Sequence, residues 1–253
     1  MGVSSNTTKW QLISEQFAQR LDDECSIPNW ICVAPIWTLP EHFQMLESYG
    51  AGKIVALSST SRFTKFQSTD REEQEIAKRL SDAEAQVQCW AEARGIEWVI
   101  LRPTLIYGLG SDKNVTEIAR LISRLGFLPL FGKAQGLRQP IHADDVAAAC
   151  ISALQVFKTA NRAYNISGGE TLTYRDMVTR IFLALDKPPR LLTVPLWMFR
   201  LAVTALRCIR RYRHWSIAMA ERMNSDLVFD HSEAAHDFGF TPRGFVLTKK
   251  DLR

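Results

Sequence analysis

Three short apolar runs occur along the chain, at residues 30–34, 54–57 and 98–101, and a further strand fits residues 163–167. Unbroken runs of this length suit strands that are buried on both faces, as in a parallel sheet. A helix fits between successive runs, and strands that alternate with helices are typical of a doubly wound sheet. We therefore predict an α/β fold with a Rossmann-like, doubly wound parallel sheet.

Two stretches carry the sequence signals of helices. Residues 71–94 carry apolar side chains at steps of four and three, and Gly95 follows them as a helix terminator. Residues 174–185 form the second stretch, and Thr173 and Asp176 have the spacing of a capping box at its start. Both stretches are predicted to be helices.

Composition places the chain among ordinary globular proteins. It has 253 residues, of which 46% are hydrophobic and 23% charged, so it is neither disordered nor a disulfide-dense mini-protein. After residue 185 the pattern changes, because prolines punctuate it and basic residues accumulate. We expect a Rossmann-like domain over residues 1–185 and a small, mainly helical C-terminal lobe over residues 186–253.

The cysteines and the N-terminus bear on location and metals. The five cysteines are scattered, with no CxxC pair and no zinc-type spacing, so we predict reduced thiols and no metal site. Residues 1–10 are polar and lack the apolar core of a secretion signal. These features predict a cytoplasmic protein.

The net charge of +4 is too small to imply a nucleic-acid partner, but its distribution is uneven. Residues 186–216 hold seven basic residues against one acidic residue. Within them, residues 196–211 form a basic, apolar stretch that is too short to span a bilayer. Two readings stay open: a core-packed helix, or a peripheral membrane contact through residues 196–213.

Three motifs occur in register along the chain. Residues 55–61 read VALSSTS, residues 101–108 read LRPTLIYG, and residues 138–146 read RQPIHADDV. In this order and spacing they resemble the extended short-chain dehydrogenase/reductase family, in its NAD-dependent epimerase/dehydratase branch. The resemblance runs from about Trp30 to Pro242. It implies an oxidoreductase with NAD or NADP as cofactor and a nucleotide sugar or related substrate. It also implies that residues 1–185 are the NAD(P)-binding domain and residues 186–253 the substrate lobe. A homodimer is a further candidate assembly.

The resemblance also implies site residues, and they fall where a parallel sheet binds ligands, beyond the carboxyl ends of its strands. Ser59, Thr60 and Lys65 are the catalytic candidates. The hydroxyl residues could instead only satisfy backbone groups in a turn. The cofactor-binding candidates are Ala34, Pro35, Ser58, Pro103 and Thr104.

The substrate-binding candidates lie in the second half of the chain. They are Asn114, Phe131, Arg138 and Arg222. A guanidinium grips phosphate oxygens in a bidentate manner, so the resemblance assigns Arg138 to a diphosphate. Arg138 could equally pair on the surface with Asp144 or Asp145.

The third motif also contains a histidine between apolar residues. A histidine in such a place is usually a hydrogen-bonded packing residue, so we predict no catalytic role for His142. Asp144 and Asp145 are expected to cap the helix that follows, over residues 146–154.

The chain departs from the family pattern at the cofactor turn. The family begins with a strand and a GxxGxxG turn that receives the cofactor pyrophosphate. This sequence has no glycine between Gly2 and Gly50, and its strand at residues 30–34 resembles the family's fourth strand. The first βαβ unit is therefore missing or replaced. An alternative start site, a truncated reading frame or a real loss of the unit would each explain this.

The second departure is at the catalytic pair. The family uses a Tyr and, four residues later, a Lys for proton transfer. Those positions fall here at about Ile76 and Leu80, whose side chains cannot transfer a proton. Lys65 and Tyr107 are possible substitutes. The sequence thus leaves two functions open. The first is an NAD(P)-dependent epimerase/dehydratase-like enzyme, and the second is an inactive relative that binds a ligand, a partner or a membrane surface.

Overall fold

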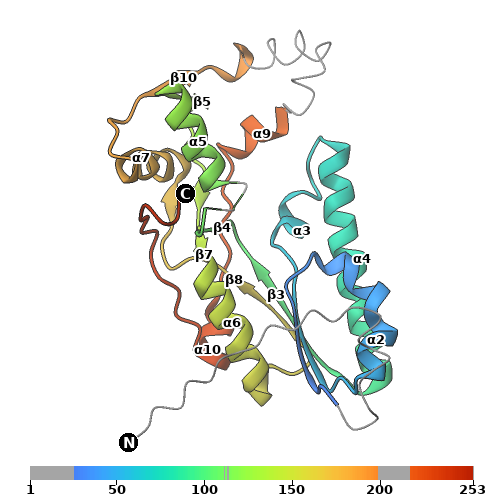
Figure 1. Ribbon diagram of the computed structural model, residues 1–253. Coiled ribbons are helices and arrows are strands. Elements are labelled where there is room, and N and C mark those ends of the chain that lie inside the picture. The colour runs from blue at the N-terminus through green and yellow to red at the C-terminus, as the bar shows by residue number, and fades with distance from the viewer. Residues whose placement is uncertain (1–25, 111, 113, 199–216, 253) are drawn as a thin grey trace, which may run out of the picture.

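A four-stranded parallel sheet is the centre of the molecule (Figure 1). The computed structural model describes residues 26–110, 112, 114–198 and 217–252. The strands are β1 (Asn29–Cys32), β2 (Lys53–Leu57), β3 (Glu97–Pro103) and β8 (Arg162–Ile166), in the order β1-β2-β3-β8. Each strand contains most or all of one of the predicted strand segments, so the predicted α/β sheet is confirmed.

One face of the sheet is covered by helices that connect β1 to β2 and β2 to β3. They are η1 (Ile36–His42), α2 (Phe43–Ser48), α3 (Ser61–Thr64) and α4 (Arg71–Arg94). The predicted helix over residues 71–94 is confirmed, and it ends at Gly95, which has a φ of 66° that favours glycine. Its apolar stripe packs on Ile54 and Ala56 of β2 and on Ile36 of η1.

The other face of the sheet is covered by α6 (Ala143–Gln155) and α10 (Ser232–Phe238). Val55, Leu101 and Tyr164 from three strands pack there against Val146 of α6. Because side chains alternate along a strand, β2 contributes Val55 to this core and Ile54 to the core beneath α4. β2 and β3 are buried on both faces, as their unbroken apolar runs predicted, whereas β1 is exposed or only partly buried.

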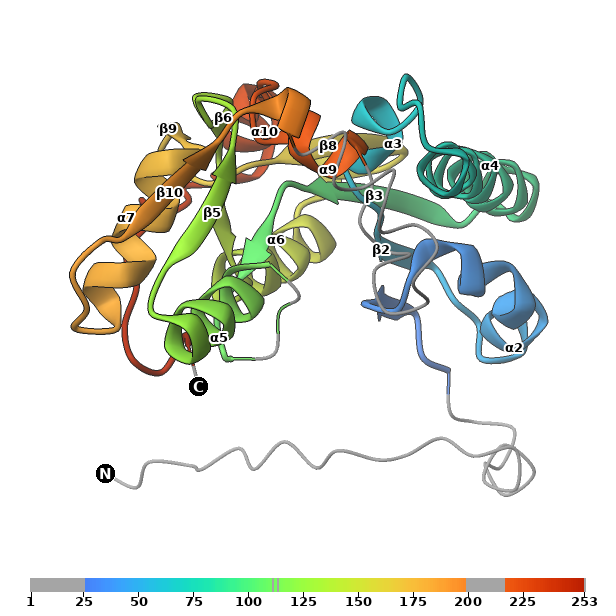
Figure 2. The same cartoon turned by 90° about the horizontal axis from the view of Figure 1, so that it is seen from above.

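A second lobe carries its own core beside the carboxyl ends of the strands (Figure 2). Its pairs of strands are β4 with β7, β6 with β9, and β5 with β10. The bounds are β4 (Ile106–Tyr107), β5 (Leu128–Phe131), β6 (Leu137–Arg138), β7 (Ile141–His142), β9 (Leu172–Thr173) and β10 (Leu191–Val194). Its helical elements are α5 (Val115–Leu125), α7 (Tyr174–Ala184) and α9 (Ile217–Arg222), and η2 (Phe157–Thr159) joins α6 to β8.

The core of this lobe joins segments that are far apart in the sequence. Ile122 of α5, Leu130 of β5 and Phe182 of α7 pack together with Met223 and Phe245 near the C-terminus. The predicted boundary between residues 185 and 186 therefore passes through a single core. The predicted helix over residues 174–185 is confirmed as α7, and Thr173 accepts a hydrogen bond from the Asp176 amide, as its capping role requires.

The start of α6 differs from the expectation. His142, rather than Asp144 or Asp145, caps this helix, because its Nδ1 accepts a hydrogen bond from the Asp144 amide at 3.1 Å. Nε2 of His142 lies 3.0 Å from the Asp251 carboxylate, and the ring is buried. Asp145 instead accepts hydrogen bonds from Arg243. The predicted packing role of His142 is confirmed, and the predicted capping role of the two aspartates is wrong.

The basic stretch at residues 199–216 lies outside the described residues. Among the residues that are described, no helix is both long enough and apolar enough to cross a bilayer.

Candidate functional site

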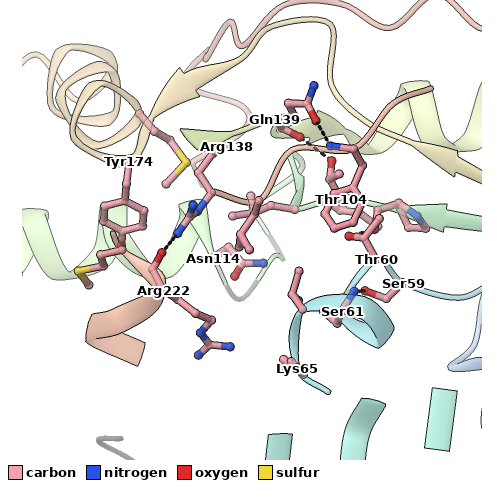
Figure 3. Close-up of a pocket in the computed structure, with 18 of the residues that line it drawn as sticks. Ser59, Thr60, Ser61, Lys65, Thr104, Asn114, Arg138, Gln139, Tyr174 and Arg222 are labelled. Carbon is pink, nitrogen blue, oxygen red and sulfur yellow. Dashed lines mark hydrogen bonds between the residues drawn. The ribbon is translucent and has the colours of Figure 1, made fainter. Parts of the chain in front are cut away.

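A cleft of about 820 Å³ lies between the sheet and the second lobe (Figure 3). One wall comes from the segments that follow β2 and β3, and the other from α5, α7 and the residues around Arg222. Nine of the predicted site residues line it: Ser58, Ser59, Thr60, Lys65, Pro103, Thr104, Asn114, Arg138 and Arg222. The sequence therefore predicted much of the lining of this cleft.

Four other candidates are not among the residues that line the cleft. Ala34 and Pro35 are exposed at the end of β1, and the Phe131 side chain is buried in the second core. Tyr107 is also buried, and its hydroxyl donates to the Val246 carbonyl. Burial raises the pKa of Tyr107 to about 12, which makes it a poor substitute for the missing proton carrier.

The hydroxyl groups of the sheet wall already hold the backbone in place. Ser59 accepts a hydrogen bond from the Ser61 amide, and Thr60 donates to the Pro103 carbonyl at 3.1 Å. Thr104 donates to the Gln139 carbonyl at 2.5 Å. The alternative that these hydroxyl groups satisfy backbone groups in a turn is thus confirmed in part. Because Ser59 only accepts here, its proton remains available to a ligand.

Gln139 is placed by a close backbone approach. The turn after β8 passes so near β7 that a Cβ on Gly168 would lie 1.9 Å from the Pro140 carbonyl oxygen. The Gly168 amide donates to the Gln139 carbonyl, which also receives the Thr104 hydroxyl. Only glycine permits this contact, so Gly168 helps to fix the wall of the cleft.

Behind the hydroxyl wall lies a buried carboxylate that the sequence analysis did not single out. Glu84 of α4 accepts hydrogen bonds from Ser58 at 2.5 Å, from Arg102 at 2.6 Å and from Arg62. It is 4% exposed, and the two guanidinium groups balance its charge. A signal existed, because Glu84 occupies the same helical stripe as Leu80, Val87 and Ala91.

The opposite wall carries the cations. Figure 3 shows Arg138 and Arg222 on the wall that faces Ser59, Thr60 and Lys65. Arg138 is 4% exposed, and its guanidinium donates to the carbonyls of Leu137, Ser225 and Arg222. Burial lowers the pKa of Arg138 to about 10, so it remains charged at neutral pH. It pairs with neither Asp144 nor Asp145.

Lys65 and Arg222 share an acidic neighbour. Arg222 forms an ion pair with Glu73 of α4 at 2.6 Å, which joins the second lobe to the sheet side. Burial, together with the charge of Arg222, lowers the pKa of Lys65, while Glu73 and Asp70 act in the opposite direction. The sequence analysis also missed Glu73, which lies seven residues before Leu80 on the buried stripe of α4.

Helix α5 begins at the cleft. Asp112 accepts hydrogen bonds from the amides of Asn114 and Thr116, so it satisfies backbone N–H groups at the start of this helix. Asn114 occupies the N-cap position, but its side chain makes no capping bond and lines the cleft instead.

The expected catalytic pair is absent from its helix. Leu80 is buried among the residues of η1 and α4, and Ile76 packs at the border of the same core. Neither side chain can transfer a proton. Among the described residues no group of His, Cys, Asp and Glu could hold a metal ion.

The described residues do not fit the pyrophosphate of a dinucleotide. β1 is an outer strand of the sheet, and the segment that follows it runs through Val33, Ala34 and Pro35 without a glycine. The close approach of a pyrophosphate to a helix N-terminus needs such a glycine turn.

Comparison with known proteins supports the resemblance. Residues 43–167 match the model of the NAD dependent epimerase/dehydratase family. UDP-glucose 4-epimerase of Vibrio cholerae is 32% identical over 121 residues, which are 48% of this chain and 37% of that protein. The chain thus spans little more than a third of the length of this relative.

Solved structures of the same kind share the fold. UDP-glucuronic acid 4-epimerase of Bacillus cereus in complex with NAD has a TM-score of 0.58 at 15% identity, over 83% of this chain and 62% of that one. UDP-glucose 4-epimerase of Thermotoga maritima with UDP-glucose has a TM-score of 0.58 at 16% identity, over 85% and 72%. The Rossmann-like fold is confirmed.

Proposed function

We propose that this chain binds a nucleotide sugar in the cleft of Figure 3. The proposal starts from the match of residues 43–167 to the model of the NAD dependent epimerase/dehydratase family. The observation that carries the proposal is the lining of the cleft. Among the described residues, three cations, Lys65, Arg138 and Arg222, line it together with a single carboxylate, Glu117. A diphosphate carries the negative charge that such a lining would balance.

The rest of the lining suits a sugar and a base. The hydroxyl of Ser59 can donate a hydrogen bond to a sugar oxygen, and the Asn114 side chain offers amide donors and acceptors. Ile118, Leu121 and Met177 add apolar surface. The volume of about 820 Å³ lies in the range of small-molecule sites. Two similar proteins, of Vibrio cholerae and Thermotoga maritima, are UDP-glucose 4-epimerases.

An oxidoreductase that uses NAD or NADP is the second candidate. It is favoured by the family, which is NAD dependent, and by the grouping of Ser59, Thr60 and the pKa-lowered Lys65 at one wall. Against it stand the apolar Ile76 and Leu80 and the absence of a pyrophosphate turn in the described residues. For this reason we propose ligand binding as the first candidate function and catalytic turnover as the second.

Isothermal titration calorimetry tests the proposal with UDP, UDP-glucose, dTDP-glucose, NAD⁺ and NADP⁺. We expect UDP-glucose or dTDP-glucose to bind, and Arg222→Ala to weaken binding at least ~10-fold through the loss of a charged hydrogen bond. Arg124→Ala, an exposed arginine on α5 outside the cleft lining, is the control and should bind normally.

The pattern of ligands decides between the candidates. Ser59→Ala is expected to weaken the binding of UDP-glucose more than that of UDP, because in the proposed complex this hydroxyl donates a hydrogen bond to the sugar. Binding of a dinucleotide, with turnover of a bound sugar nucleotide, would favour the oxidoreductase. If none of the five compounds binds, the proposed function is wrong.

A further inference from the structure

The buried arginine of the cleft wall has little surface left for a ligand. Arg138 is 4% exposed, and its guanidinium donates hydrogen bonds to the carbonyls of Leu137, Ser225 and Arg222. Most of its N–H donors are therefore used by the protein itself. Arg138 contributes positive charge to this wall, but an anion bound there needs a further donor beside that charge.

Tyr174 lies against the Arg138 guanidinium and lines the cleft. The guanidinium carbon is 5.5 Å from the centroid of the Tyr174 ring, which is within the range of a cation–π contact. Figure 3 shows the ring beside Arg138, on the wall that also carries Arg222. A largely buried tyrosine usually finds a hydrogen-bond partner for its hydroxyl group.

The Tyr174 hydroxyl has no such partner within the described part of the chain. It is not a fully enclosed atom either, since the buried side-chain atoms that lack a partner there belong to Tyr49 and Asn165. The hydroxyl is thus accessible from the cleft that the side chain lines. Because a phenol can donate one hydrogen bond, this proton is available to a ligand.

The backbone donors at the start of α7 are already used. The amides of Tyr174 and Arg175 donate to backbone carbonyls in the loop before β6, at 2.9 and 3.0 Å. The Asp176 amide donates to the Thr173 hydroxyl. None of these three amides is free for an anion, so the donor that this end of α7 presents to the cleft is the phenol of Tyr174.

We propose, on the basis of the proposed function of the cleft, that Tyr174 binds the diphosphate of the nucleotide sugar. Its hydroxyl donates a hydrogen bond to a phosphate oxygen beside Arg222. Arg138 supports this contact in two ways: its charge attracts the phosphate, and its guanidinium packs against the Tyr174 ring. Ser59, which is expected to meet the sugar, lies on the opposite wall (Figure 3).

The charges around Tyr174 favour a phosphate oxygen over a neutral sugar oxygen. Arg138 and Arg222 both act on the hydroxyl and lower the pKa of Tyr174, but burial has the larger effect and raises it. The hydroxyl therefore stays protonated at neutral pH and can donate. A donor beside two cations gains most from a charged acceptor, because hydrogen bonds to ionised groups are about twice as strong as neutral ones.

Isothermal titration calorimetry with UDP and UDP-glucose, on the wild-type chain and on Tyr174→Phe, tests the proposal. The variant keeps the ring against Arg138 and removes only the hydroxyl. We expect the affinities for both ligands to fall by the same factor, roughly 10-fold, because both ligands carry the diphosphate. Ser59→Ala, by contrast, should affect UDP-glucose more than UDP. The free energy of unfolding in urea should be unchanged in Tyr174→Phe, since the hydroxyl bonds to no described residue.

Thr179→Val is the matched control on the same helix. The Thr179 hydroxyl donates to the Arg175 carbonyl within α7, and Thr179 is outside the cleft lining, so both affinities should stay unchanged. Phosphorus NMR of bound UDP gives a second readout. A diphosphate resonance should move in Tyr174→Phe and keep its wild-type position in Thr179→Val.

The contrary results separate this assignment from the proposed function. A wild-type chain that binds neither ligand overturns both. Normal binding of both ligands by Tyr174→Phe overturns the assignment of Tyr174 alone. A selective loss of UDP-glucose binding also overturns it, because the hydroxyl would then serve the sugar. So does a loss of affinity that comes with a loss of stability, which would make the role of the hydroxyl structural.

Discussion

Arg138 shows that a charged residue can belong to the cleft and to the fold at once. Its guanidinium joins β6 to the segment after α9 through the carbonyls of Arg222 and Ser225. The family resemblance predicts that it binds a phosphate, but nothing in the sequence indicates these bonds, because their acceptors lie more than eighty residues away. Backbone acceptors leave no trace in a side-chain pattern.

We therefore expect Arg138→Met to destabilise the protein as well as the site. The substitution leaves buried carbonyls without donors, which should lower the free energy of unfolding by about 2–4 kcal/mol. Urea denaturation of the wild type and the variant measures this. Arg124→Met, which replaces an exposed arginine, should change it little. An equally stable Arg138→Met variant would mean that the carbonyls find other donors.

Lys65 predicts a pH dependence of ligand binding. Its pKa is lowered chiefly by burial, and a lysine is charged only below its pKa. As the pH rises, Lys65 loses its charge earlier than an exposed lysine would, so the affinity for UDP should begin to fall at a lower pH. In Lys65→Met the early part of this decline should disappear, and the fall that remains should be the one caused by Arg138, whose pKa is about 10. Calorimetric titration with UDP across alkaline pH is the measurement.

The control for this experiment is Lys78→Met, at an exposed position of α4. Its alkaline profile should match that of the wild type. A Lys65→Met profile that still declines like the wild type would assign the decline to another group.

At the scale of elements, the sequence predicted what local pattern determines. The four strands of the sheet, α4 and α7 follow from apolar runs, periodicity and capping residues. The short strand pairs of the second lobe did not, because β5 pairs with β10 some sixty residues later and the register is set by that contact. Glu84 was missed since a carboxylate on a helix usually faces water.

Glu84 makes α4 a structural anchor for the cleft wall. Glu84→Gln would leave Arg62 and Arg102 with a neutral partner in a buried position, which should cost about 3–5 kcal/mol of unfolding free energy. It should also loosen Ser58, whose hydroxyl donates to this carboxylate. Glu75→Gln, at an exposed position of the same helix, is the control in urea denaturation. Equal stability of the two variants would contradict the anchoring role.

At the scale of the whole molecule, the two lobes meet across the cleft through the ion pair of Arg222 and Glu73. A ligand phosphate at Arg222 must share this cation with Glu73. Removing the negative charge of Glu73 should raise the local positive potential, so Glu73→Gln is expected to tighten UDP binding by about 3- to 10-fold at low ionic strength. The gain should shrink in high salt, because the Arg222 side chain is partly exposed.

Calorimetry at two salt concentrations measures this effect, with Glu75→Gln as a control that removes the same charge from an exposed position outside the cleft lining. Weaker binding by Glu73→Gln would show the reverse, that Glu73 orients Arg222 for the ligand. In both cases the affinity for UDP depends on the contact between Glu73 of α4 and Arg222 of α9. These two helices lie about 150 residues apart in the sequence, so the contact is non-local. The cleft therefore lies where the two lobes meet, and ligand affinity should depend on the negative charge of Glu73 in the ion pair between them.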